Sequence, residues 1–400
     1  MSTVVSKSYK FRFYPSSAQR QQLAKDFGCA RFAWNYALER RTKAYQESGE
    51  RLTGVDLSRE LTKLKNSTHL WLAEANSTVI TQALRDQDRA FANFFAGRAK
   101  CPKFKKKRTA QSVRYQLDQR QVHRTFNAQS HSLALPNLGP LKLRWSREVG
   151  GVPKMVTVSR DACGRFFVAF SCEVEAQPLP DLSAPARAGG CPAQAGKTNL
   201  IGIDFGVKDV VVTSEGEKSG NPRHIKKRER HLKRAQRRLN RKTKGSHRYR
   251  KQQFRVARLH ARVVDARRDF LHKTSWKLVS ENQALAIQPH NVQGMFANHK
   301  LARAISDVGL GELTRQIKYK AQWYGRQVFE VDPWQRTTGV CPDCLRIGPK
   351  LALDVREWRC ECGKVHDRDV ASARVIKIVG AGGPEVMRVE GGTHRLAAAV

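Results

Sequence analysis

Acidic residues are scarce in this sequence. Asp and Glu together number 35 in 400 residues, against 74 Lys and Arg, so the formal net charge is +39. A soluble protein with so large a positive charge needs a polyanionic partner, and nucleic acid is the first candidate. The basic residues run through the whole length of the chain instead of forming one tail, so we expect a large contact surface.

Long apolar runs are missing as well. No stretch approaches the ~20 apolar residues that are needed to cross a bilayer. The first residues, MSTVVSKSYKF, lack the apolar core of a signal peptide. The sequence therefore predicts an intracellular protein that stays in the cytoplasm.

Cysteine is sparse outside one cluster, and five of the nine are scattered, as expected for reduced thiols: Cys29, Cys101, Cys163, Cys172 and Cys191. The other four form the pairs Cys341-Pro-Asp-Cys344 and Cys360-Glu-Cys362. Two thiolate pairs separated by a hairpin of about fifteen residues are typical of a zinc ribbon with structural Zn²⁺. The second pair is one residue shorter than usual, so His366 is an alternative to Cys362 as a ligand. A redox pair is the competing interpretation.

The first part of the chain predicts a β-structure with a helical insert. Residues 9–14 alternate like a strand that Pro15 ends, and helical patterns fill residues 15–100. Short strands separated by turns follow over residues 111–175, which predicts a small barrel or open antiparallel sheet that residues 9–14 complete. Residues 176–198, rich in Pro, Ala and Gly, are typical of a linker.

Two features of this part bear on function. The helical pattern over residues 77–98 carries Phe91, Phe94 and Phe95, which we expect to pack in the helix core. The stretch CPKFKKKR, residues 101–108, is tethered by a proline and an aromatic residue. It therefore predicts a fixed contact to a phosphate backbone, with a solvated loop as the alternative.

The second part is organised around LIGIDFGVKDVVVTSEG, residues 200–216. An apolar strand ends at Asp204, and the chain turns into a second strand at residues 210–212. An aspartate after a strand is often only a solvated turn residue. Residues 222–273 then form the densest basic block, which Gly245 divides into two helices with few acids, so we expect a polyanion to lie against them.

Strands and helices alternate after this block. A short strand over residues 284–287 ends at Gln288, a helix over 309–326 leads to a strand over 327–331, and a last helix covers 370–379. This order is that of the ribonuclease H type of α/β fold. There, acids such as Asp204 and Asp369 converge on two divalent metals, and a third acid is expected where the 284–287 strand ends.

Taken together, IDFGVKD, the basic helices, CPDC with WRCECG, and HDRD resemble the RuvC domain of TnpB proteins, which are encoded by insertion sequences and related to type V CRISPR effectors. The resemblance extends to YKFRFYPSSAQ, ARFAWNYALERR and CPKFKKKR, and so to nearly the whole chain. It implies an α/β and α+β multidomain protein: a wedge β-barrel (1–14 and 101–175), a helical recognition insert (15–100), and a RuvC domain (199–379) with a zinc ribbon at 338–366. A flexible tail (380–400) ends the chain.

The resemblance also implies partners and a location. They are a guide RNA from the transposon end and double-stranded DNA carrying a short adjacent motif, in the bacterial cytoplasm at the nucleoid. The basic residues expected to contact nucleic acid are Lys105, Lys106, Lys107, Arg108, Lys226, Lys227, Arg234, Arg237, Arg238 and Arg241.

The catalytic acids of the family map onto this chain incompletely. The first falls on Asp204 and the last on Asp369, but the middle Glu falls on Gln288. An amide oxygen is a poor substitute for a carboxylate at a hard cation, so we expect Mg²⁺ to bind weakly or not at all. A second departure agrees with this, because Ala371 stands where the family has Asn.

Three functions remain open from the sequence. The first is guide-RNA-dependent DNA binding by an impaired nuclease, acting as a roadblock or repressor of transcription. The second is an active RNA-guided endonuclease that supports transposon maintenance with a relocated acid such as Glu330 or Asp332. The third is a basic nucleic-acid-binding remnant without a specific guide.

Overall fold

The computed structural model describes residues 4–107, 111–120, 122–182, 200–348 and 355–382. Arg108, Cys191 and most of the predicted linker and tail lie outside these ranges. The chain divides into two compact units, residues 1–175 with 245–257 and residues 176–244 with 258–400, and each is described by itself. None of the described helices is long and apolar enough to cross a membrane.

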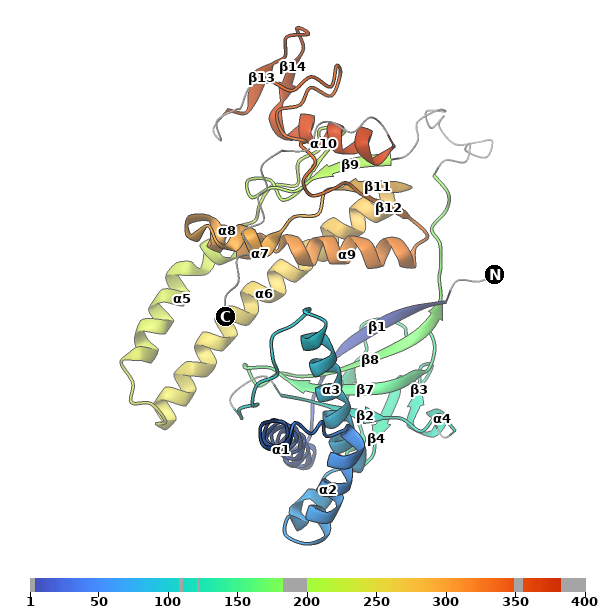
Figure 1. Ribbon diagram of the computed structural model, residues 1–400, viewed down its shortest axis with the longest axis vertical. Coiled ribbons are helices and arrows are strands. Elements are labelled where there is room, and N and C mark those ends of the chain that lie inside the picture. Colours follow the sequence, from blue (N-terminus) through green and yellow to red (C-terminus); the bar gives the residue numbers. More distant parts are fainter. Residues whose placement is uncertain (1–3, 108–110, 121, 183–199, 349–354, 383–400) are drawn as a thin grey trace. The chain divides into compact units, whose positions relative to one another are not determined.

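The first unit contains a five-stranded antiparallel sheet in the order β2-β7-β8-β1-β6 (Figure 1). Strand β1 pairs with β8 along its whole length, from Val4 opposite Glu175 to Phe13 opposite Phe166. This confirms that the first strand joins the later ones, while closure into a barrel stays a prediction. The strands are β1 (Val4–Phe13), β2 (Gln111–Gln116), β6 (Leu143–Arg144), β7 (Pro153–Arg160) and β8 (Phe166–Glu175), with β3 (Phe126–Asn127), β4 (Ser132–Leu135) and β5 (Gly139–Pro140) in a smaller sheet.

The helices of the first unit share one core with this sheet. Ser16 begins α1 with a capping box, in which its side chain accepts from the Gln19 main-chain N–H and the Gln19 side chain accepts from the Ser16 main-chain N–H. Buried Leu23 of α1, Val79 of α3 and Phe11 of β1 belong to the same apolar cluster. The helices are α1 (Ser17–Ser48), α2 (Gly54–Asn66), η1 (Leu70–Glu74), α3 (Ser77–Phe95) and α4 (Val122–Thr125).

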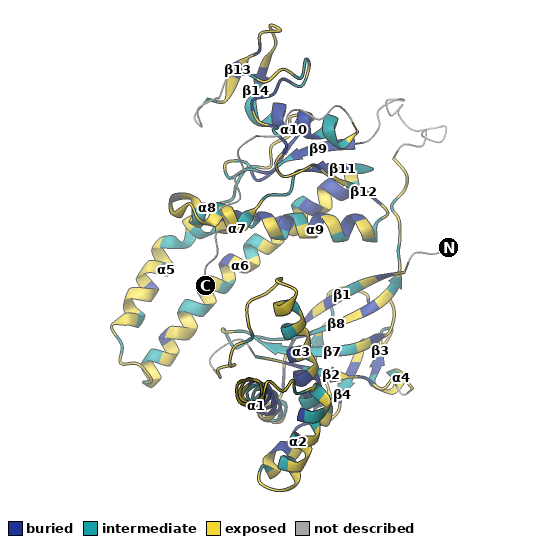
Figure 2. Ribbon diagram, in the orientation of Figure 1, coloured by how far each residue is buried: buried dark blue, intermediate teal, exposed yellow. Residues whose placement is uncertain are grey.

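The end of α3 differs from the sequence expectation. Phe94 and Phe95 are 37% and 77% exposed, so the prediction that they pack in the helix core was wrong. The physical reason is that the buried positions of α3 run only from Val79 to Gln87, two turns before the helix ends. The last turn therefore carries aromatic side chains on a face without a core beneath it, as the exposed end of α3 in Figure 2 shows.

The second unit is built on a four-stranded sheet in the order β10-β9-β11-β12. Strand β9 (Leu200–Asp204) is antiparallel to β10 (Val212–Thr213) and parallel to β11 (Ala284–Ile287), which is parallel to β12 (Gln327–Glu330). The carboxyl ends of β9, β11 and β12 consequently meet at one edge of the sheet.

Helices cover both faces of this sheet. Ile203 and Ile287 pack with residues of α6 (His247–Glu281) and α9 (Leu310–Trp323), while Leu200 and Ala286 pack against Ile376 of α10 (Arg368–Gly380). Helix α10 approaches β9 so closely that a Cβ on Gly202 would stand 2.0 Å from the Ala373 carbonyl oxygen. Only glycine permits this approach.

Other elements of the chain from residue 200 onward match the sequence prediction or extend it. Gly245, with φ +89°, lies between α5 (His224–Asn240) and α6, as predicted. The second strand of the first hairpin is shorter than predicted, because a turn takes up residues 206–210, where the Gly206 N–H donates to the Val210 carbonyl. Two helices, α7 (Val292–Phe296) and α8 (His299–Val308), were missed. A hairpin of β13 (Glu357–Arg359) and β14 (Val365–Asp367) precedes α10.

Candidate functional site

Asp204 stands at the carboxyl end of β9, half-buried beneath the start of α10. Burial, followed by the negative charge of Asp369, raises the pKa of its carboxyl to about 7, and a hydrogen bond with Ser372 acts in the opposite direction. The influence of Asp369 on this pKa indicates that the two predicted acids face a common site.

Asp369 lies in the first turn of α10, where a carboxylate also interacts favourably with the helix dipole. The helix begins with Asp367, whose side chain accepts 3.0 Å hydrogen bonds from the main-chain N–H groups of Asp369 and Val370. Arg356 binds the Asp369 carboxylate at 3.3 Å, and Lys218 binds Asp367 at 2.6 Å. Both acids at this helix start are therefore already partnered by cations.

Gln288 follows β11 directly, one residue beyond the register pair Ile287–Ile203, and so lies beside Asp204 at the sheet edge. Its amide nitrogen donates to the main-chain carbonyls of Asp332 (3.0 Å) and Gln335 (2.7 Å), with a longer contact to Pro333 (3.5 Å). These partners are all acceptors. A carboxylate, which has no donor when ionised, could not replace the amide in this arrangement.

A chain of side chains connects Gln288 with Asp204. The Thr337 hydroxyl donates to the Gln288 amide oxygen at 3.1 Å, the Ser372 hydroxyl lies 3.2 Å from the Thr337 hydroxyl, and Ser372 also hydrogen-bonds with Asp204. Thr337 and Ser372 are both buried. Sequence reasoning missed both residues, although Ser372 is one helical turn from Asp369 and its placement on the same face of α10 was a usable signal.

The two acids considered as replacements take up different positions. Glu330 pairs in register with Ile287, so it points to the α6 and α9 face of the sheet, where Lys318 of α9 binds it at 2.7 Å. Asp204 is on the opposite face. The Asp332 side chain accepts a 2.8 Å hydrogen bond from the Trp334 main-chain N–H and so closes the turn that Gln288 holds.

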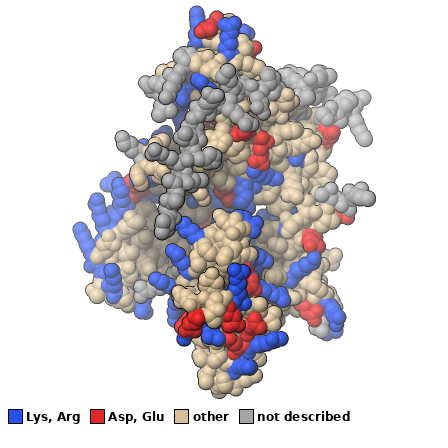
Figure 3. All heavy atoms as spheres, in the orientation of Figure 1, with Lys and Arg blue, Asp and Glu red and all other residues tan. Residues whose placement is uncertain are grey.

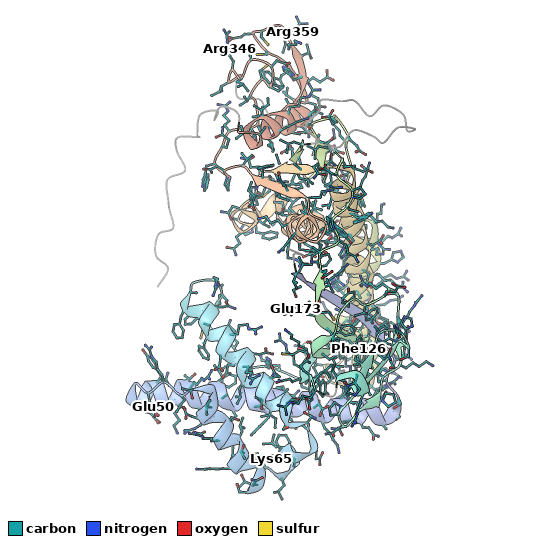
Figure 4. The ribbon with its side chains drawn as sticks, turned by 90° about the vertical axis from the view of Figure 1, so that its right-hand side faces the viewer. Glu50, Lys65, Phe126, Glu173, Arg346 and Arg359 are labelled. Atoms are coloured by element: carbon teal, nitrogen blue, oxygen red, sulfur yellow. The ribbon has the colours of Figure 1, made fainter. Side chains whose placement is uncertain are left out.

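The four clustered cysteines come together as predicted. Their Sγ atoms all lie within 4.8 Å of one another, in a set that can hold a metal ion. Separations of 3.7 Å (Cys341–Cys362) and 3.6 Å (Cys344–Cys360) show that Cys362 reaches the cluster despite the shortened spacing. His366 also comes within 3.2 Å of the Cys341 sulfur, in a second group with Asp343. In Figure 4, the labelled residues Arg346 and Arg359 lie at the end of the zinc-ribbon region that is farther from α10.

Helix α5 presents an almost entirely basic surface. The six residues singled out from its sequence and C-cap are all exposed or half-buried: Lys226, Lys227, Arg234, Arg237, Arg238 and Arg241. Its one acid, Glu229, is neutralised by Lys233 (2.7 Å) and by Arg303 of α8 (2.8 Å). Lys and Arg side chains gather over α5 in Figure 3. Such a surface suits a phosphate backbone.

A cavity of about 700 Å³ opens at the start of α5. Its two acids are engaged, since Glu229 is paired as above and Asp307 accepts hydrogen bonds of 2.9 and 3.1 Å from the Ile225 main-chain N–H. Basic residues from separate segments dominate the rest of its lining: Lys208, Arg223, Lys226, Arg303 and Arg356. Arg356, which also binds Asp369, joins this cavity to the acidic site. No single stretch of sequence predicts it, because it is assembled from distant segments.

The basic segment of the first unit is held in a defined path. The Asn35 side chain of α1 exchanges two hydrogen bonds with the main chain of Lys105, at 2.8 and 3.1 Å. The Lys105 ammonium lies 3.6 Å from the centre of the Trp34 ring. Lys105 is therefore partly used in a structural contact, while Lys106 and Lys107 are exposed; Arg108 lies outside the described residues.

Known protein families and relatives resemble this chain over most of its length. A family model described as "Probable transposase" matches residues 169–299, and one described as "Cas12f1-like, TNB domain" matches residues 311–376. A Streptomyces pristinaespiralis protein named "Putative RNA-guided DNA endonuclease" is 41% identical over 381 residues, covering 94% of this chain and 90% of that protein. The chain belongs to the TnpB family. An Escherichia coli K12 protein, "Putative RNA-guided DNA endonuclease InsQ", is 30% identical over 395 residues, covering 94% of this TnpB chain and 92% of InsQ.

The fold of this TnpB protein also has a solved counterpart. The cryo-EM structure of the Cas12f1-sgRNA-target DNA complex aligns with a TM-score of 0.53 at 12% identity, covering 94% of this chain and 99% of Cas12f1. A third family model, "Helix-turn-helix domain", matches residues 1–50. In the described part of that range, residues 4–50, the structure contains strand β1 and the single long helix α1.

Proposed function

We propose that this TnpB protein binds double-stranded DNA under the direction of a guide RNA, with a RuvC-type nuclease site that is impaired. Relatives covering nearly the whole chain carry the name "Putative RNA-guided DNA endonuclease", which supports RNA and DNA as partners. The strand order β10-β9-β11-β12, with Asp204 at the carboxyl end of β9 and Gln288 directly after the parallel strand β11, supports the ribonuclease H assignment. A DNA-bound protein that cuts poorly acts as a roadblock to transcription.

The observation that carries the impairment is the amide of Gln288. Its nitrogen donates to main-chain carbonyls and its oxygen accepts from Thr337, so the side chain is held in place and brings no negative charge beside Asp204. Mg²⁺, when bound in such sites, activates water and steadies the leaving oxygen. With one position neutral and Asp369 paired to Arg356, the residues present do not fit a two-metal site.

The remaining groups still suit nucleic acid without cutting it. The basic cavity beside Arg356 and the exposed face of α5 place positive charge next to the acids, where a strand would pass. Two of the acids at this site are held by Arg356 and Lys218, which reduces their repulsion of a phosphate. The protein's own residues can therefore bind and orient a strand while lacking the charge to hold catalytic ions.

We further infer that the ribbon holds structural Zn²⁺ through Cys341, Cys344, Cys360 and Cys362. Four sulfur ligands at this mutual spacing match the donor set of a closed zinc site. The wedge, recognition and RuvC assignments and the predicted boundaries belong to the same proposal, as does a guide RNA from the transposon end.

The test uses protein purified with its co-purifying RNA. RNA sequencing identifies the guide, and a plasmid carrying the matching target is incubated with the complex and Mg²⁺. We expect guide-dependent binding of the target, detected by a gel shift. Cleavage should be at least about a thousandfold slower than that of a TnpB protein that has Glu at the position of Gln288, a loss of ~4 kcal/mol in transition-state stabilisation. Comparable cleavage that Asp204→Ala abolishes would overturn the impairment. Binding without any discrete RNA would favour a remnant that has lost its guide.

A further inference from the structure

The last turn of α3 carries an aromatic cluster that the proposed function does not use. Phe95 is 77% exposed and Phe94 37%, and their ring centres are 5.3 Å apart. Phe91 stacks beneath Phe95 at 6.2 Å with an angle of 24° between the rings, and the Arg41 guanidinium lies over Phe91 at 5.5 Å. We call Phe91, Phe94 and Phe95 the aromatic shelf.

The helix turn that carries the shelf has a defined end. Gly97 adopts the left-handed conformation, and the N–H groups of Gly97 and Arg98 donate to the carbonyls of Phe94 and Asn93, both at 2.9 Å, so the helix end is closed by main-chain hydrogen bonds. Arg41, the base of the stack, is fixed by an ion pair with Asp88. The main chain beneath the exposed rings is therefore already ordered before a flat ligand stacks on them.

The charge of the adjoining sequence favours one class of ligand. No acid occurs between Asp88 and Asp118, while basic residues occur throughout that interval, among them Arg89, Arg98, Lys100, Lys103, Lys106 and Lys107. Phe104, 56% exposed, adds a further aromatic ring in the same acid-free stretch. Aromatic faces interleaved with cations are the arrangement that binds unpaired nucleotides, because bases stack on the rings while phosphates meet the charges.

From these observations we propose that the aromatic shelf is a stacking platform for an unpaired base of the bound RNA. The proposal rests on the proposed function in one respect, namely that the protein carries a guide RNA before it meets its target. Phenylalanines left exposed on that protein–RNA complex would promote association between molecules, and a stacked base would cover them. Duplexes do not fit, because their base faces are covered except at the ends. The basic residues of 98–107, which follow the shelf in the chain, would contact the phosphates of the same RNA strand.

The test is direct oligonucleotide binding by the full-length protein, freed of co-purified RNA. The probe is a short oligoadenylate RNA with one 2-aminopurine, whose fluorescence falls on stacking. Phe94→Leu combined with Phe95→Leu should lower affinity about tenfold or more, the range for losing one base–aromatic stack, and should remove the quench. The salt dependence of RNA binding by this double variant should equal that of the wild type. Tyr45→Leu, which removes a 61% exposed aromatic near Glu47 and Glu50, is the matched control and should have no effect.

A second variant separates stacking from charge. Lys106→Ala combined with Lys107→Ala should weaken binding with a smaller salt slope, by about one unit for each lost phosphate contact, yet retain the quench. The proposal is overturned if the Leu variant binds the RNA as wild type does, if it loses affinity for a paired RNA duplex equally, or if only oligodeoxyadenylate binding changes. Absence of a discrete guide in the purified protein would instead count against the proposed function, since this assay does not need one.

Discussion

The side-chain amide of Gln288 donates a 2.7 Å hydrogen bond to the main-chain carbonyl of Gln335. Together with the bond to the Asp332 carbonyl, this fixes the turn that leads from β12 towards the cysteine cluster. The residue that replaces the family's middle acid is thus part of the local structure. Its substitution has consequences for stability as well as for chemistry.

Gln288→Glu should therefore not restore cleavage at neutral pH. An ionised carboxylate would face the same carbonyl oxygens without a proton to donate, at a cost of about 1–3 kcal/mol in the free energy of unfolding. The loss should shrink as the pH falls, because protonation returns a donor. Chemical denaturation at two pH values measures this, with exposed Gln327→Glu at the start of β12 as the control. A Gln288→Glu variant that is as stable as the wild type and cuts its target would contradict this prediction.

Zinc content should distinguish Cys362 from His366 as the fourth ligand. The Cys362 sulfur belongs to the four-sulfur group, so Cys362→Ser should lower bound zinc and the melting temperature, whereas His366→Asn should retain one zinc per chain. Metal analysis of the purified variants gives the answer. Full zinc in Cys362→Ser together with loss in His366→Asn would assign the site to the histidine instead.

Lys320 predicts a pH dependence of stability in the second unit. It is buried in α9, where its ammonium donates to the His272 carbonyl (2.7 Å) and the Ser275 hydroxyl (2.8 Å), and burial lowers its pKa from 10.5 to about 8. The unfolded chain then binds more protons between these values, so stability rises as the pH increases from 8 to 10.5, by at most ~3 kcal/mol. Lys320→Met should remove that rise. The free energy of unfolding of the wild type and of the variant is measured across this pH range, and the difference between the two isolates the contribution of Lys320. A variant whose stability rises with pH as steeply as that of the wild type would contradict the prediction.

Gly202→Ala should disrupt the second unit. Its Cβ would stand 2.0 Å from the Ala373 carbonyl oxygen and 2.7 Å from the Lys377 main chain, so α10 would have to move away from β9. We expect a loss of about 3 kcal/mol or more, at the upper end for overpacking. Thermal melting of this variant beside Gly216→Ala, where a Cβ meets no neighbour but φ is +91°, separates the steric clash from backbone strain. Equal losses in both variants would argue against the clash.

The exposed arginines of α5 should contribute non-specific affinity. Replacing Arg237 and Arg238 by Ala is expected to weaken binding of DNA of any sequence and to lower the salt slope by about one unit for each lost phosphate contact. Lys273→Ala on α6, whose ammonium is paired with Asp269 at 2.8 Å, is the control. Filter binding across a salt series measures both quantities, and an unchanged slope would place the nucleic acid elsewhere.

Sequence reasoning succeeded where local pattern and long-range packing agree. The strand ending at Asp204, the strand before Gln288 and the cysteine pairs each carry a strong local signal, and the structure places all of them as elements of one unit. It failed at Phe94 and Phe95, because helical periodicity shows which side chains share a face but not where the packing partner of that face ends. Helix α7 was missed because its five residues form little more than one turn, whereas α8 places Leu301, Ile305 and Val308 at helical spacing, a usable signal that was overlooked.

The connections around the site were beyond the sequence. Thr337, Ser372 and Arg356 matter because of what they contact, and each contact joins segments far apart in the chain. Glu330 illustrates the same limit. As an acid at the end of the neighbouring strand it looked like a substitute for Gln288, but strand alternation turns it to the other face and towards Lys318.

The absence of a side chain at Gly202 has a wider meaning for this molecule. Since β9 and α10 touch through main-chain atoms, the span between the Asp204 and Asp369 carboxylates depends on the backbone and hardly on which side chains fill the surroundings. The scaffold of a nuclease site can therefore persist after cleavage is lost. Replacement of one acid by an amide would leave the spacing of the two remaining acids unchanged.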